Sequence, residues 1–126
     1  MNRRTLVVFL FLIFIVTSVN AAVPGNRIAL VIGNASYEMM PLDHPVNDAR
    51  AMTGVLKDAG FQVITVLEAN LQAMQSTMLQ FTASLNKDST ALVYYAGHGV
   101  QSNGRNYLLP VDAKLESEGA LRFEGM

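Results

Sequence analysis

The stretch Arg27–Gly33 reads RIALVIG, and two later stretches share its character: Phe61–Leu67 reads FQVITVL, and Thr90–Ala96 reads TALVYYA. Each is a short apolar run, rich in branched or aromatic side chains, with a glycine close to one end. Runs of this length and composition are typical of strands that are buried on both faces of a parallel sheet. These three stretches therefore predict the core strands of the fold.

Helical patterns fill the two intervals between these strands. From Val46 to Ala59 apolar side chains recur every three or four residues, with Pro45 in the expected first turn and Gly60 as the expected C-terminal cap. A second stripe runs from Leu71 to Leu85, and Asn70 is its expected N-cap. The order strand, helix, strand, helix, strand predicts two βαβ units, which build a parallel sheet with helices on its faces. The fold class is therefore α/β.

The segment that follows the third strand predicts a hairpin. Residues 100–109 contain the pair Asn103-Gly104, which suits the two central positions of a type I′ turn, and Pro110 ends the pattern. Residues 111–126 mix charged residues with glycine and predict no regular element.

The N-terminal residues have the three-part pattern of a secretory signal peptide. Arg3 and Arg4 form a basic start, residues 6–16 are wholly apolar, and small residues around Ala21 suit a cleavage site. We expect residues 1–21 to be a signal peptide and residues 22–126 to be an exported domain, periplasmic or secreted. An uncleaved N-terminal membrane anchor is the alternative, although the apolar run is short for a spanning helix.

Composition narrows the range of partners. The chain has 126 residues and no cysteine, and removing residues 1–21 would leave seven basic residues against ten acidic ones. No basic cluster is present, which argues against nucleic acid and against an anionic membrane surface. With two histidines and no cysteine, we expect no metal site.

One ionisable group of catalytic type stands at a strand end. His98 lies between Gly97 and Gly99, directly after the third strand. In open parallel sheets, binding and catalytic sites lie beyond the carboxyl ends of the strands. We expect this histidine to be exposed and sterically open, with a ring that exchanges protons near neutral pH. Taken alone, a histidine at a strand end is more often a structural turn residue than a catalytic one.

Three stretches, taken together and in order, carry a family resemblance: RIALVIGN, HPVNDARAMTGVLKDAGF and ALVYYAGHGVQ, with YLLPVDA after them. In this combination the chain resembles the caspase-like cysteine peptidases, most of all the bacterial relatives of metacaspases, from Arg27 to about Ala113. The resemblance implies a caspase-like three-layer αβα fold with a mostly parallel sheet. It also implies a cysteine endopeptidase that acts on polypeptides after Arg or Lys. It implies no cofactor; calcium activates some members of the family, and this sequence does not show whether it does so here.

The resemblance assigns roles to three residues. His98 matches the catalytic histidine, and the backbone N–H of Gly99 matches a donor that stabilises the oxyanion. Asp48 matches the acidic residue of the pocket for the substrate residue before the cut. An acid in the first turn of a helix is equally explained by the helix dipole, so both interpretations of Asp48 stay open. Ala96 departs from the family, whose members often have a small hydroxyl residue there, and this removes one hydrogen bond to the substrate.

The nucleophile is not within the sequence. A caspase-type cysteine is expected about 50 residues after the histidine, near position ~148. We therefore expect the domain to be truncated before its catalytic cysteine, its fold to be incomplete, and these 126 residues to be inactive alone. The alternative is a non-catalytic caspase-like module that binds peptides or partner chains. A nucleotide-binding domain is a weaker hypothesis, because Gly33-Asn34 does not continue into GxGxxG.

Overall fold

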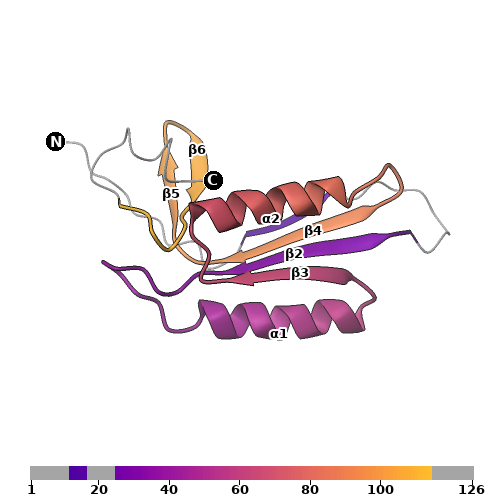
Figure 1. Cartoon of the computed structure of the whole chain (residues 1–126), viewed down its shortest axis with the longest axis horizontal. Helices are drawn as coiled ribbons and strands as arrows, with labels where there is room; N and C mark the ends of the chain where they lie inside the picture. Colours follow the sequence, from indigo (N-terminus) through magenta and orange to yellow (C-terminus); the bar gives the residue numbers. More distant parts are fainter. Residues whose placement is uncertain (1–11, 17–24, 115–126) are drawn as a thin grey trace.

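A mostly parallel sheet lies between two helices in the computed structural model, which describes residues 12–16 and 25–114 (Figure 1). The main elements are β1 (Leu12–Val16), β2 (Arg27–Gly33), α1 (Pro45–Asp58), β3 (Gln62–Leu67), α2 (Leu71–Ala83) and β4 (Thr90–Ala96). The strand order is β1-β4-β2-β3, and β2 pairs in parallel with both β3 and β4. This confirms the two predicted βαβ units and the α/β fold class.

Strand β2 is central because its side chains are apolar on both faces. Ile28, Leu30 and Ile32 belong to the cluster that contains the α2 residues Met74 and Phe81. The intervening residues Ala29 and Val31 belong to a second cluster, on the α1 side of the sheet. Alternation along a strand sends successive side chains to opposite faces. An unbroken apolar run therefore fills both layers at once, as the sequence predicted.

The first turn of α1 packs against the carboxyl end of β2. A Cβ atom added to Gly33 would lie 2.6 Å from the Cβ of Ala49 and 2.7 Å from the carbonyl oxygen of Pro45. Only glycine permits this approach without a shift of the helix. The contact places the start of α1, and with it Asp48, at the edge of the sheet where β2 ends.

Strand β1 falls within the predicted signal peptide. Its backbone pairs antiparallel with β4, from Leu12 opposite Tyr95 to Val16 opposite Ala91. Cleavage after Ala21 would remove this strand and leave the edge of β4 open for another strand. The rest of the predicted leader lies outside the described residues, so the leader stays a prediction. No helix in the described part of the chain is long and apolar enough to cross a membrane.

The predicted hairpin is confirmed. Strands β5 (Gly99–Ser102) and β6 (Arg105–Leu108) pair antiparallel. Asn103 and Gly104 have positive φ angles of 50° and 73°, as a type I′ turn requires. The hairpin stands at the end of the sheet where β4 ends (Figure 1). The expected functional edge therefore carries the hairpin on one side and the loop after β2 on the other.

Candidate active site

Three segments meet around a fully buried asparagine at this edge. The side-chain NH₂ of Asn34, directly after β2, donates to the carbonyl oxygens of Leu109 at 3.3 Å and Ala69 at 3.4 Å. Its side-chain oxygen accepts the N–H of Ala69 at 2.8 Å. Buried amides of this kind are costly unless they are paired. Asn34 thus ties the end of β2 to the β3–α2 connection and to the segment after the hairpin.

His98 is buried, contrary to the expectation of an exposed residue. It is only 4% exposed, because the loop after β2 folds over it. The ring of Tyr37, from that loop, lies 4.5 Å from the His98 ring between centroids, with the planes tilted by 57°. Gly97 is also closely packed, since an added Cβ would lie 2.5 Å from the hydroxyl oxygen of Tyr95 and 2.7 Å from that of Tyr37. The flanking glycine therefore permits close packing rather than access.

The two ring nitrogens of His98 are in different environments. Nε2 lies 2.7 Å from the carbonyl oxygen of Met40. A carbonyl only accepts hydrogen bonds, so Nε2 carries the proton, and in the neutral ring Nδ1 is then the nitrogen with a free lone pair. Nδ1 is buried and has no hydrogen-bond partner among the residues that the structure describes. The ring is thus oriented by one nitrogen and has its basic nitrogen unpaired, which is the arrangement that a general base requires.

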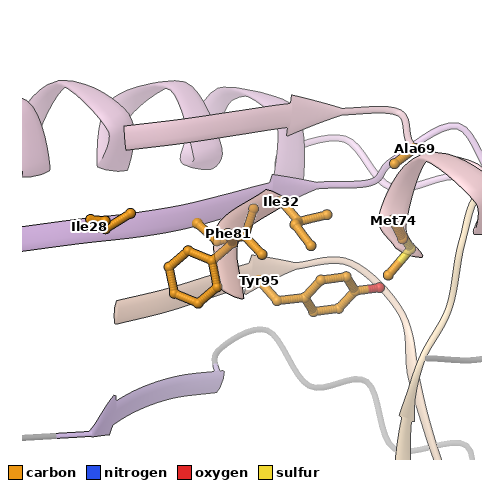
Figure 2. Packing of buried hydrophobic residues seen from close by; sticks show 7 residues of the cluster. Ile28, Ile32, Ala69, Met74, Phe81 and Tyr95 are labelled. Carbon is orange, nitrogen blue, oxygen red and sulfur yellow. The ribbon is translucent and has the colours of Figure 1, made fainter. Parts of the chain in front are cut away.

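Two tyrosine hydroxyls bind the backbone of His98. The N–H of His98 donates to the hydroxyl of Tyr37 at 3.0 Å, and the hydroxyl of Tyr95 donates to the carbonyl oxygen of His98 at 2.6 Å. The Tyr95 ring lies in the cluster under α2, with its hydroxyl pointing toward the end of the sheet near Met74 and Ala69 (Figure 2). Burial raises the pKa of Tyr37 and of Tyr95, so both hydroxyls remain protonated donors at neutral pH.

The other two predicted site residues lie close to this edge. Gly99 is buried at the start of β5, opposite Leu108 in the hairpin. Asp48 is half-buried in the first turn of α1. Burial, and then the charge of Asp48, raise the pKa of Tyr94 in β4. Gly99 is next to His98 in the sequence itself, whereas Asp48 makes none of the hydrogen bonds described for His98.

Sequence reasoning missed Met40, Tyr37 and Asn34. Met40 acts through its carbonyl oxygen, a group that every residue has, so no residue type could have indicated it. Tyr37 lies in a stretch that reads as a polar loop between Ala35 and His44, and its partners are distant in sequence. Asn34 offered a weak signal, because a polar residue directly after a buried strand stands where the carboxyl ends of parallel strands meet.

No metal site emerges from the described residues. Within residues 12–16 and 25–114, no group of three or more His, Cys, Asp or Glu side chains is placed to hold a metal ion.

Comparison with known proteins identifies the family of this chain. The family model for the caspase domain matches residues 26–123. The human mucosa-associated lymphoid tissue lymphoma translocation protein 1 is 35% identical over 89 residues, which are 70% of this chain and 11% of that protein. A paracaspase from Dictyostelium discoideum is 30% identical over 94 residues, 69% of this chain and 23% of its own length. This chain thus spans about a tenth to a quarter of the curated relatives it matches. With the caspase-domain match over most of the sequence, the chain belongs to the caspase domain family.

Proposed function

We propose that this chain supplies the histidine half of a cysteine endopeptidase. The observation that carries the proposal is the state of His98, whose Nε2 is held by the Met40 carbonyl while Nδ1 is buried and without a described partner. A base of this kind activates a thiol in peptidases that use cysteine. The 126 residues contain no cysteine, so the thiol would have to come from outside them.

The reaction follows ordinary acyl transfer. Nδ1 of His98 takes the thiol proton, and the thiolate attacks the carbonyl carbon of the scissile peptide bond. The backbone N–H of Gly99, next to the histidine, donates to the oxyanion that develops. His98 then returns the proton to the nitrogen of the leaving amine as the C–N bond breaks. Water then attacks the carbonyl carbon of the acyl-enzyme as Nδ1 takes one of its protons. The C–S bond breaks, the carboxylic acid product leaves, and Nδ1 returns the proton to the thiolate.

The proposal is tested with two forms of the protein. We expect the 126-residue chain alone to hydrolyse no reporter peptide that ends in Arg or Lys. A form extended by the coding sequence that follows, with a cysteine about 50 residues after His98, should hydrolyse it. Release of a fluorescent leaving amine is the measurement. Activity that appears in the extended form and disappears when its cysteine is changed to alanine supports the proposal.

The second candidate function is a non-catalytic caspase-like module. The observation in its favour is the absence of cysteine from the sequence. An extended form that has serine or glycine at the expected position, and that binds peptides without cutting them, would favour this candidate over the peptidase.

We propose that Asp48 selects substrates with Arg or Lys before the cut. It is half-buried in the first turn of α1, at the sheet edge that carries His98. We expect Asp48→Asn to lower the preference for basic over neutral residues by about tenfold or more, because a carboxylate paired with a guanidinium contributes roughly 1.5–3 kcal/mol. The measurement is the ratio of kcat/KM for an Arg-ended and a neutral reporter in the extended form.

Asp58→Asn is the matched control for this prediction. Asp58 is exposed at the opposite end of α1, so its replacement makes the same charge change away from the site. If Asp48→Asn changes the preference no more than Asp58→Asn does, the pocket role is wrong and the helix-dipole interpretation of Asp48 holds.

We also propose that the protein acts outside the cytoplasm on polypeptide substrates, without nucleic acid as a partner. The basic and apolar leader pattern of residues 1–21 supports the first part. The lack of any basic cluster supports the last part.

A further inference from the structure

We infer that Tyr37 is a positioning residue for His98. Its side chain contacts the turn after β4, which carries the His98 ring, and anchors the loop after β2, which carries the Met40 carbonyl that Nε2 binds. The inference rests on the proposed role of His98 as the base. It concerns contacts between the loop after β2 and the turn after β4, two segments that lie about 60 residues apart in the sequence.

Tyr37 holds the turn in two ways. Its hydroxyl accepts the backbone N–H of His98 at 3.0 Å, and its ring lies 4.5 Å from the His98 ring. The first contact fixes the main chain of the histidine, and the second restricts rotation of the imidazole about its side-chain bonds. Together they limit where Nδ1 and Nε2 can lie.

Tyr37 also anchors the loop that brings Met40 to Nε2. The side chains of Met39 and Met40 are 87% and 44% exposed, so burial of these apolar groups does not hold the loop in place. Tyr37, three residues before Met40, is only 7% exposed, and its hydroxyl donates to the carbonyl oxygen of Leu109 at 2.9 Å. The carboxylate of Glu68 accepts two backbone N–H groups at the start of the loop, on the side of Tyr37 away from Met40. Beyond Met40, the partly buried Leu42 packs against the cluster of Tyr37 and Leu109, and its N–H donates to the carbonyl oxygen of Ala35 at 2.8 Å. Tyr37 is therefore the anchor near the acceptor that also contacts His98.

The number of hydroxyl protons shows that Tyr37 and Tyr95 have different hydrogen-bond roles at His98. Each hydroxyl has one proton to donate. The shortest contact of the Tyr95 hydroxyl is to the carbonyl oxygen of His98, at 2.6 Å, so its proton lies there. The proton of Tyr37 then goes to Leu109, at 2.9 Å, or to the Tyr95 oxygen, at 3.0 Å, while a lone pair of Tyr37 accepts the N–H of His98.

This count predicts unequal effects of losing each hydroxyl. Without the Tyr95 hydroxyl, the carbonyl oxygen of His98 still accepts the N–H of Leu109 at 3.0 Å. Without the Tyr37 hydroxyl, the buried N–H of His98 loses its acceptor and the loop loses its bond to Leu109. A buried N–H without an acceptor raises the free energy of the folded state. The turn after β4 and the loop after β2 should therefore shift until water or another group accepts this N–H.

The test measures the His98 ring directly, by ¹⁵N NMR of the 126-residue chain. In the unchanged chain, at a pH where the ring is neutral, we expect one ring nitrogen of protonated type, Nε2, and one of unprotonated type, Nδ1. Tyr37→Phe keeps the aromatic ring and removes the hydroxyl. We expect it to move the two nitrogen resonances toward each other, as the tautomers mix. The amide of His98 should exchange with solvent about tenfold faster relative to the amides of β2, the effect of one lost hydrogen bond.

Tyr94→Phe is the matched control, because it removes a hydroxyl from the same strand as Tyr95 but on the α1 side of the sheet. We expect it to leave the tautomer and the relative exchange of the His98 amide unchanged. A purely structural role for Tyr37 predicts something different: all core amides would exchange faster by the same factor, with the His98 tautomer intact. That result overturns the inference.

Two measurements decide the question even if Tyr37→Phe does not fold. The first is the ring of the unchanged chain in its neutral form. If it is a mixture of the two tautomers, or if Nδ1 carries the proton, the inference is overturned. The second is the ring of a Tyr95→Phe variant. If this variant mixes the tautomers, the inference is also overturned, because the proton count leaves the bond between Tyr37 and His98 intact in that variant. A single tautomer in both proteins supports it. None of these readouts needs a nucleophile or a substrate, so failure of the peptidase proposal and failure of this inference give separate results.

Discussion

Replacing His98 with alanine should lower kcat/KM of the extended, cysteine-containing form by about 10³-fold or more. In the proposed mechanism the imidazole would both activate the thiol and protonate the leaving amine, so its loss would remove two proton transfers. Its Nδ1 is buried and has no hydrogen-bond partner among the described residues, so its lone pair is not already engaged. The measurement is hydrolysis of an Arg-ended reporter peptide, with a thermal melt to show that the variant folds.

His44→Ala is the matched control for this experiment. His44 is the other histidine of the sequence; it is exposed before α1 and its side chain makes no capping hydrogen bond. We expect His44→Ala to keep nearly full activity. Residual activity of His98→Ala above about a tenth of the unchanged enzyme would show that His98 is not the base, since a general base contributes at least about 10²-fold.

Replacing Gly97 with alanine should destabilise the chain by about 3 kcal/mol or more, since it overpacks a buried site and disturbs paired hydroxyls. The added Cβ would lie 2.5 Å from the hydroxyl oxygen of Tyr95 and 2.7 Å from that of Tyr37. Those oxygens end rigid rings, and both lie within hydrogen-bond distance of each other and of the carbonyl oxygen of Leu109. Neither can retreat without breaking a contact with the backbone of His98.

The stability change is read from thermal unfolding. A loss of about 3 kcal/mol in a domain of this size lowers Tm by more than about 10 °C. Gly54→Ala is the control: Gly54 is exposed within α1, and an added Cβ there meets nothing within 4 Å. Alanine is the better helix former, so Gly54→Ala should raise stability by roughly 0.5–1 kcal/mol. If Gly97→Ala instead melts within about 2 °C of the unchanged chain, the packing described for this turn is wrong.

Much of the fold was readable from local patterns. The strand limits of Arg27–Gly33 and Thr90–Ala96 match the predicted apolar runs at both ends. Asn70 caps α2 as predicted, with its side-chain oxygen accepting the N–H of Ala73 at 2.8 Å. Helix α2 ends at Ala83, two residues before the predicted Leu85. Helix ends fray and carry weaker signals than helix faces, which explains this difference.

The candidate site was only partly readable. Pattern and resemblance together indicated His98, because its residue type can transfer protons and it stands at a strand end. They gave the wrong environment, since glycine neighbours suggested an open turn while His98 is 4% exposed. The roles of His98, Asp48 and Gly99 all stay predictions, because they depend on a thiol, a bound substrate and an oxyanion.

The hydrophobic periodicity and the order of the elements determined the architecture of this protein. A strand that is apolar on both faces is typical of the middle of a parallel sheet, where helices cover both faces. The tertiary structure alone decided the state of the histidine. The group that accepts from Nε2 is the main-chain carbonyl of Met40. The group that accepts the backbone N–H of His98 is the hydroxyl of Tyr37, in a loop about 60 residues earlier. Sequence patterns report which side chains are apolar along a short stretch, whereas these contacts depend on where distant backbone groups meet once the sheet has formed.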